Sequence, residues 1–397
     1  MDPASPGGGG RGGAGGRADL SVTLSFEWVD TEASLRAATE RLEGAAAVAI
    51  DTEADSFYHY FHKCCLIQVS DGEAVYLIDP LALRALEPLG TIMAARGITK
   101  ILHAAEQDVL YLRRDYGFQL VPLFDTMIAA QLLGLPSVGL AGLLERFLGL
   151  KMDKGPQRDD WSRRPLSERQ KTYAGEDVLH LIRLRDLLRA ELVAKDRLDW
   201  AEEEFEVVAL RAWEPRGFDP AGFWSVKGAR DLTPREAAVL RELYVMRDER
   251  ARQGDVPPFR IASDETLFAL ARRSPSTAAD LEGIKGFTPL VRRRIGPAAL
   301  QAVSRGLMLP DAELPVPPRG QGRRKSAAAQ VRLERLRAWR KERAAALAID
   351  PGVLMPQSTL EALSIAGLPG LEGDSPISGL RTWRKRLLRA DATRLLA

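Results

Sequence analysis

Cysteine is scarce in this sequence, and its two copies exclude the scaffolds that cysteine usually builds. Cys64 and Cys65 are adjacent within a predicted strand, so their side chains should point to opposite faces. That arrangement suits neither a disulfide framework nor a zinc site, and it is typical of a reducing compartment. The four histidines do not have the spacing of zinc ligands either: His59, His62, His103 and His180.

Long apolar runs and a strong net charge are missing as well. No stretch approaches the roughly 20 apolar residues of a membrane span, and the N-terminus lacks the apolar segment of a signal peptide. We therefore expect a cytoplasmic protein without a membrane partner. The net charge is +2, so the overall charge does not predict a polyanionic partner, although arginine clusters locally in the C-terminal half.

The chain is long enough for several domains. Residues 1–19 are rich in glycine and predict a disordered tail. Residues 20–205 predict an α/β domain with a mixed sheet, because strand patterns at its start give way to mixed strands and helices. The predicted strands span residues 21–26, 45–50, 64–70, 73–79 and 98–103, and the predicted helices span residues 31–42, 81–95, 104–116, 126–133, 139–147 and 167–194.

Two carboxylates after the apolar run 45–50 are the first sign of chemistry. Asp51 and Glu53 are two residues apart, so they would project from the same side of a strand. Neighbouring carboxylates resist burial unless a cation compensates them, and a hard divalent ion with oxygen ligands is the natural compensation. Alone, such a pair more often marks a solvated turn.

Two predicted helices carry further candidates. Asp108 lies near the start of a helix, where the helix dipole by itself would favour negative charge. Tyr173 and Asp177 are four residues apart, so they share one face of the helix that a Ser167–Gln170 capping box begins. Such a pair is usually an ordinary surface contact, but a hydroxyl beside a carboxylate is also a sensible way to hold a water next to a metal ion.

Together these segments place four carboxylates and a tyrosine at one strand end and on two helices. Two-metal phosphoryl-transfer sites need this arrangement, because one ion activates water and the other stabilises the leaving oxygen roughly 3.5–4 Å away. Carboxylates supply the hard oxygen ligands that such ions prefer.

The full pattern resembles a known family. Asp51-x-Glu53, Asp108 and Tyr173-x3-Asp177 are similar to the DEDDy branch of the DnaQ-like 3′→5′ exonucleases, which have a ribonuclease H-like fold. Within that branch, the chain resembles the ribonuclease D family from about residue 22 to residue 200. The segments that carry this closer likeness are Cys65-Leu-Ile-Gln-Val, Leu77-Ile-Asp-Pro-Leu, Phe124-Asp-Thr, Asp160-Trp-Ser-Arg-Arg-Pro-Leu-Ser-Glu-Arg-Gln and Tyr173-Ala-Gly-Glu-Asp-Val.

The resemblance implies a role for each of the five residues. Asp51 would bridge two divalent ions, Mg²⁺ or Mn²⁺, and Glu53 and Asp177 would complete the ligands of the ion that carries the attacking water. Asp108 would hold the second ion. Tyr173 would orient the water through its hydroxyl, because a phenol with a pKa of about 10 is a weak base at neutral pH.

Further residues allow two interpretations. Gln68 and Phe57 are candidates for contacts with the terminal nucleotide, and core or rim positions are equally plausible. His103 is a candidate phosphate contact, although packing at a strand end is the commoner role, and Asp125 is expected to cap a helix rather than to bind metal. Three cations on the loop before the Tyr173 helix are candidates for phosphate contacts or belong to an ordinary exposed loop: Lys151, Lys154 and Arg158.

The C-terminal half predicts two helical modules, at residues 231–311 and 330–397, separated by linkers at residues 206–230 and 312–329. The first module resembles the HRDC domain through its Gly283-Ile-Lys-Gly-Phe turn. There Lys285 is a candidate phosphate contact, unless the module only packs on the nuclease domain. The second module is more weakly HRDC-like. It begins with an amphipathic helix whose basic residues, Arg340 among them, predict a phosphate-binding face or a merely solvated one.

The predicted function is metal-dependent 3′→5′ trimming of structured RNA such as tRNA precursors, releasing nucleoside 5′-monophosphates, by a protein expected to be a monomer. The same five residues would serve a DNA exonuclease, because none of them reads a 2′-hydroxyl. A non-catalytic RNA-binding scaffold is the alternative of another class. Four clustered acids argue against it, because they would repel phosphate.

Overall fold

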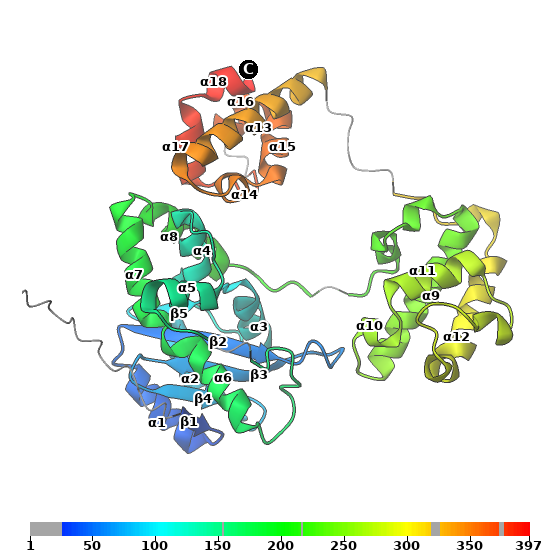
Figure 1. Ribbon diagram of the computed structural model, residues 1–397, viewed down its shortest axis with the longest axis horizontal. Helices are drawn as coiled ribbons and strands as arrows, with labels where there is room; N and C mark the ends of the chain where they lie inside the picture. Colours follow the sequence, from blue (N-terminus) through cyan, green and yellow to red (C-terminus); the bar gives the residue numbers. More distant parts are fainter. Residues whose placement is uncertain (1–25, 153–154, 216, 319–325, 373–376) are drawn as a thin grey trace, which may run out of the picture.

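The structure is a computed structural model that describes residues 26–152, 155–215, 217–318, 326–372 and 377–397. The predicted glycine-rich tail and most of the first predicted strand lie outside these residues. The chain forms an α/β domain followed by two helical modules (Figure 1). Across the described ranges, no helix combines the length and the apolar character that a membrane span requires.

A six-stranded mixed sheet forms the centre of the α/β domain, in the order β1-β4-β3-β2-β5-β6. β2 lies inside the sheet, antiparallel to β3 and parallel to β5. β3 and β4 pair as the predicted hairpin around the Asp71-Gly72 turn, where Gly72 has a φ of 95°. The strands are β1 (Phe26–Val29), β2 (Ala47–Ala54), β3 (Cys64–Ser70), β4 (Val75–Ile78), β5 (Thr99–Leu102) and β6 (Leu123–Asp125).

Eight helices surround the sheet in the described part of this domain. α6 packs over β2, β3 and β4, and α7 packs over β2 and β5. The helices are α1 (Glu32–Leu42), α2 (Glu87–Ala94), α3 (Glu106–Tyr116), α4 (Thr126–Leu133), α5 (Leu140–Leu148), α6 (Glu168–Leu179), α7 (Leu181–Ala194) and α8 (Leu198–Ala209).

Several predicted boundaries in this domain were wrong. The single helix predicted for residues 167–194 is two helices, because His180 leaves the helical region with a φ of −105° and a ψ of 0°. The helix predicted from residue 81 begins only at Glu87, since Asp79 first turns the chain by accepting from the Leu81 N–H. β2 continues to Ala54, because its pairing with β3 extends that far. Asp51 and Glu53 therefore lie within the strand.

The first helical module has a separate core. The predicted linker at residues 206–230 is shorter than predicted, because α8 continues to Ala209 and Phe223, Val226 and Ala229 are buried in this core. The helices of the module are α9 (Pro234–Gln253), α10 (Pro258–Ile261), α11 (Asp264–Arg273) and α12 (Pro289–Met308), with short 3₁₀ turns η1 (Pro220–Ser225), η2 (Ala229–Asp231) and η3 (Ala279–Leu281), and η4 (Asp311–Glu313) follows.

The second helical module shares one continuous core with the α/β domain. Trp383 stacks on Trp200 of α8 with ring centroids 4.6 Å apart. Gly134, with a φ of 72°, lies so close to the module that a Cβ there would be 1.7 Å from the Ala348 carbonyl oxygen. The helices are α13 (Ala327–Leu347), α14 (Pro351–Leu354), α15 (Gln357–Ala366), α16 (Leu368–Glu372), α17 (Thr382–Arg389) and α18 (Ala392–Leu396).

Glu204 of α8 is one polar attachment of this second module. It accepts hydrogen bonds from Trp383 Nε1 at 3.1 Å and from the guanidinium of Arg384, which is 6% exposed. We expect Glu204→Ala to lower the free energy of unfolding by about 2–4 kcal/mol, because it leaves a buried charge without its partner. Chemical denaturation would measure this free energy for Glu204→Ala and for the control Glu202→Ala, which removes an exposed carboxylate of the same helix. Equal losses in the two variants would contradict this role.

Candidate active site

Three carboxylates converge at the centre of the sheet. Asp51 and Glu53 project from the same side of β2. Asp177 approaches from α6, whose start is set by the predicted Ser167–Gln170 capping box. One carboxylate oxygen from each of the three acids lies within 4.8 Å of the other two. Oxygens at that spacing can share a cation.

Asp108 reaches the same region from the first turn of α3. It is 8% exposed, and the hydroxyl of Thr52 donates to its Oδ1 at 2.5 Å. The charge of Asp108 is also one of the causes that raise the pKa of Asp51, so these two carboxylates influence each other directly. Thr52 was not among the predicted site residues. The available signal was its position between the two acids of β2.

Tyr173 lies one helical turn before Asp177, and its hydroxyl is hydrogen-bonded to that carboxylate. Gly155 packs so closely against the phenol ring of Tyr173 that a Cβ at position 155 would lie 2.1 Å from a ring carbon. The ring of Trp161 lies beside the phenol, with the two ring centroids 6.3 Å apart. Burial, together with the charge of Asp177, raises the pKa of Tyr173. The phenol therefore keeps its proton at neutral pH.

Burial dominates the electrostatics of all four acids. It raises the pKa of Glu53 to about 9 and the pKa of both Asp108 and Asp177 to about 7. It also raises the pKa of Asp51 well above its ordinary value, and the neighbouring carboxylates add to the effect on Asp51 and Glu53. Without a cation, this cluster therefore holds protons at neutral pH, because four negative charges crowded into a poorly solvated site are too costly.

These residues line an open cavity of about 870 Å³. Its wall also includes Phe57, which is 48% exposed, and the guanidinium-bearing Arg158. Among the described lining residues, Arg158 is the only permanent cation opposite four carboxylates. Apart from Arg158, the described lining residues offer a phosphate no permanent positive charge, and their carboxylate oxygens are the donors that hard divalent ions prefer. The residues thus fit the divalent metal ions that the sequence predicted.

His103 lines this cavity, but its imidazole is hydrogen-bonded within the protein. Burial lowers its pKa to about 4, so the ring is neutral. The Thr126 hydroxyl donates to the Leu102 carbonyl and therefore accepts from His103 Nδ1 at 2.9 Å. By this network Nε2 carries no proton, which argues against donation from His103 to a phosphate.

Gln68 and Asp125 lie next to the cavity rather than in its wall. Gln68 faces Asp51 across the β2–β3 pairing and is fully buried, and no hydrogen-bond partner for its amide is present among the described residues. Asp125 caps α4, as predicted, by accepting from the N–H groups of Met127 and Ile128. Asp125 also accepts from two N–H groups just before α3, so it positions the segment that carries Asp108.

The two predicted phosphate contacts of the helical modules lie outside the cavity wall. Lys285 pairs with Glu265 at 3.0 Å. Arg340 donates to the Met355 carbonyl at 2.9 Å, so it helps to fold the second module.

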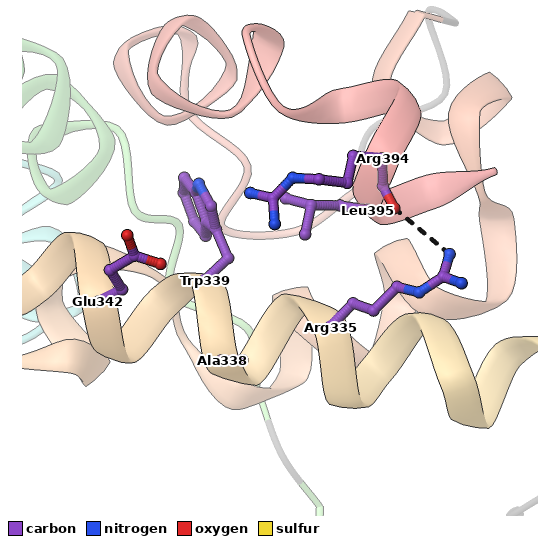
Figure 2. Close-up of a pocket in the computed structure, with 6 residues that line it drawn as sticks. All are labelled: Arg335, Ala338, Trp339, Glu342, Arg394 and Leu395. Atoms are coloured by element: carbon purple, nitrogen blue, oxygen red, sulfur yellow. Dashed lines mark hydrogen bonds between the residues drawn. The ribbon is translucent and has the colours of Figure 1, made fainter.

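α13 has the predicted amphipathic pattern, with Leu333, Leu336 and Trp339 buried. Figure 2 shows a second of its basic residues, Arg335, donating to the Arg394 carbonyl beside a pocket of about 350 Å³. Part of the predicted basic face is therefore used within the module.

The raised pKa values predict how the stability of the metal-free protein depends on pH. In the unfolded chain these acids ionise near pH 4, whereas in the folded protein they do so at about pH 7 to 9, so the folded state binds more protons in between. We therefore expect the melting temperature in EDTA to fall as pH rises from 5.5 to 8.5. Adding Mg²⁺ or Mn²⁺ should restore it, most strongly at high pH.

Thermal unfolding followed by circular dichroism measures both effects. Asp51→Asn serves as the comparison, because it removes one of the acids without changing its size. A melting temperature that rises between pH 5.5 and 8.5 in EDTA, or an equal response to metal in this variant, would contradict the electrostatic argument.

Comparison with known proteins identifies the domains. The 3′-5′ exonuclease family model matches residues 26–193, and the HRDC domain model matches residues 236–303 and 329–369. Ribonuclease D of Pseudomonas paraeruginosa is 33% identical over 369 residues, which cover 91% of this chain and 94% of that protein. Ribonuclease D of Escherichia coli K12 is 32% identical over 296 residues, 74% of this chain and 78% of that protein.

Solved structures give the same result. The crystal structure of Escherichia coli RNase D, an exoribonuclease involved in structured RNA processing, matches with a TM-score of 0.71 and 27% identity, covering 94% of this chain and 99% of that one. The catalytic core of RRP6 from Trypanosoma brucei matches with a TM-score of 0.66 and 28% identity, covering 72% of this chain and 81% of that one. The predicted fold is confirmed, and the chain belongs to the ribonuclease D family of 3′→5′ exoribonucleases.

Proposed function

We propose that this 3′→5′ exoribonuclease trims the 3′ ends of structured RNA, such as tRNA precursors, and releases nucleoside 5′-monophosphates. The observation that carries the proposal is the open cavity in which four crowded carboxylates and a tyrosine hydroxyl meet, on a chain that also has two HRDC modules. A binding scaffold has no use for acids that repel RNA. The predicted cytoplasmic location and monomeric state stay predictions.

The four acids would hold two divalent ions, Mg²⁺ or Mn²⁺. When bound, such ions neutralise the scissile phosphate and lower the pKa of the attacking water. Asp51 would serve both ions; this is supported by its position within reach of Glu53 and Asp177 and by its electrostatic interaction with Asp108. The hydrogen bond from Thr52 keeps Asp108 oriented toward the site.

Tyr173 would orient the attacking water. Its hydroxyl proton is directed to Asp177, so the lone pairs of the phenol oxygen remain free to accept a hydrogen bond from water. Attack at phosphorus breaks the bond to the 3′ oxygen of the preceding nucleotide. The released nucleotide therefore keeps its 5′ phosphate, and the shortened RNA ends in a new 3′-hydroxyl.

Substrate binding would use both the cavity wall and the helical modules. The exposed ring of Phe57 can stack on a terminal base, and Arg158 can contact a phosphate. Exposed arginines such as Arg293 and Arg294 on the first module, and Arg337 on the second, would hold the RNA body through its phosphates. None of these groups distinguishes RNA from DNA, so DNA remains the alternative substrate.

Substitution of Asp51 tests the catalytic assignment. We expect Asp51→Asn to lower the rate of shortening roughly a thousand-fold or more, because it removes the carboxylate shared by both ions, while RNA binding changes little. A 5′-labelled, 3′-extended tRNA and a matched single-stranded DNA would be followed as product ladders, with Mg²⁺ and with EDTA. Normal turnover by the variant would refute the assignment, and preferential shortening of the DNA would favour the alternative substrate.

Substitution of Tyr173 tests the proposed orientation of water. Tyr173→Phe keeps the ring that packs under Gly155 and removes only the hydroxyl, so kcat should fall by about 10- to 100-fold with little change in KM. Tyr116→Phe is the matched control, because that ring lies in the same domain outside the cavity wall. Equal kcat values for the two variants would exclude a role for the Tyr173 hydroxyl.

A further inference from the structure

The two helical modules are attached to the nuclease domain in different ways. The second module shares the core of that domain, so the burial of apolar side chains holds it in place. The first module has its own core, against which the nuclease-domain residue Tyr60 packs. Its attachment to the nuclease domain therefore needs another explanation.

The loop of residues 55–63, which joins β2 to β3, contacts the first module. The Tyr60 hydroxyl donates to Asp248 Oδ1 at 2.8 Å, and Asp248 is only 9% exposed. His59 Nδ1 lies 2.8 Å from Asp255 Oδ2. Figure 1 shows this loop extending from the end of β2 toward α10. We call the four residues His59, Tyr60, Asp248 and Asp255 the clasp.

Two more contacts support the clasp. The backbone N–H of Phe61 donates to Asp255 Oδ1 at 3.0 Å, so one carboxylate binds the loop through both of its oxygens. The guanidinium of Arg260 on α10 lies 4.3 Å from the ring centroid of Tyr58. Four consecutive residues of the loop thus meet the first module.

The loop itself is braced from within. Asp55 is fully buried, and its carboxylate accepts from the backbone N–H and from the Nζ of Lys63 at 2.8 and 2.7 Å. Its carbonyl accepts from the N–H groups of Tyr58 and His59 at 2.8 and 3.0 Å. These internal hydrogen bonds make the loop rigid, so the residues at its tip keep a fixed position relative to β2.

The other side of the same loop faces the catalytic cavity. Ser56 and Phe57 line that cavity, directly after the strand that carries Asp51 and Glu53. The Tyr58 hydroxyl donates to the Arg158 carbonyl at 3.0 Å. The loop therefore contacts the cavity wall and the first module at once.

Both ring nitrogens of His59 have a polar partner. Nδ1 lies 2.8 Å from Asp255 Oδ2, and because a carboxylate can only accept, Nδ1 donates in this contact. Nε2 lies 3.2 Å from the hydroxyl oxygen of Ser162, which itself donates to Asp160. The imidazole ring is therefore held between the nuclease domain and the first module.

We propose that His59 and Tyr60 are positioning and specificity-determining residues: through Asp255 and Asp248 they hold the first HRDC module at a fixed distance from the cavity. This inference rests on the proposed function, in which that module holds the body of a structured RNA. With the clasp closed, a held RNA body presents its 3′ end at the carboxylates. A short unstructured RNA needs no such hold, because it reaches the cavity by itself.

The test uses the full chain with Tyr60→Phe and Asp255→Asn combined. Both changes are nearly isosteric, and asparagine tolerates the left-handed backbone at position 255, where φ is 45°. Glu249→Gln is the matched control, because it neutralises an exposed carboxylate next to Asp248 on the same helix. Each protein is assayed on a 3′-extended tRNA and on a short unstructured RNA.

We expect the combined variant to raise KM for the tRNA about ten-fold while kcat and the hydrolysis of the short RNA stay unchanged, since the Tyr60–Asp248 hydrogen bond is lost and the His59 contact loses the carboxylate of Asp255. The control should behave as the parent protein. Equal losses on both substrates, or no change on the tRNA, would overturn the specificity role.

A distance measurement tests the clasp without any activity. Spin labels on Arg36→Cys of α1 and Gln301→Cys of α12 report the separation of the two units, and the buried Cys64 and Cys65 should not react. The distance distribution should be narrow in the parent and broad in the combined variant. An unchanged distribution would refute the clasp. If the parent shortened no RNA, the proposed function would fail, and this measurement would still decide the clasp.

Discussion

The mutual repulsion of four crowded carboxylates, two of them buried and two partly exposed, is the constraint on which this structure depends. Asp51 and Glu53 lie on an inner strand, and Asp108 and Asp177 reach them from helices, so water can screen their charges only poorly. Burial makes ionisation costly, and each neighbour adds to the cost. A folded protein keeps such a cluster only if it gains something when cations enter. Bound cations would let this wall accept a phosphate, for which the described lining residues offer only the permanent positive charge of Arg158.

Other charged residues near the four acids have hydrogen-bond or ion-pair partners within the protein. Asp125 receives four backbone N–H groups and so fixes the starts of α3 and α4. Arg164 forms a two-pronged ion pair with Asp79, at 2.7 Å for each contact, and ties the segment before α6 to the sheet. These neighbouring charges are compensated within the protein.

The two HRDC modules illustrate two ways of building on a catalytic domain. Apolar burial holds the second module in place, with the Trp200–Trp383 stack at the junction. The hydrophobic effect is non-directional, so this attachment does not depend on the geometry of any single contact. Hydrogen bonds hold the first module through a few residues of one loop. These bonds are directional and few, so they set a position without making the two units one body.

The sequence by itself determined the local parts of the site. Spacings of two in a strand and four in a helix put Asp51 with Glu53 and Tyr173 with Asp177, and the capping box placed the start of α6, because such signals act within a single element. Only the tertiary structure decided that β2 extends past Glu53, that His180 divides two helices and that Gln68 is buried opposite Asp51. It also decided that His59 meets Asp255, 196 positions away in the chain. No local pattern encodes such contacts, because they depend on how finished elements pack against one another.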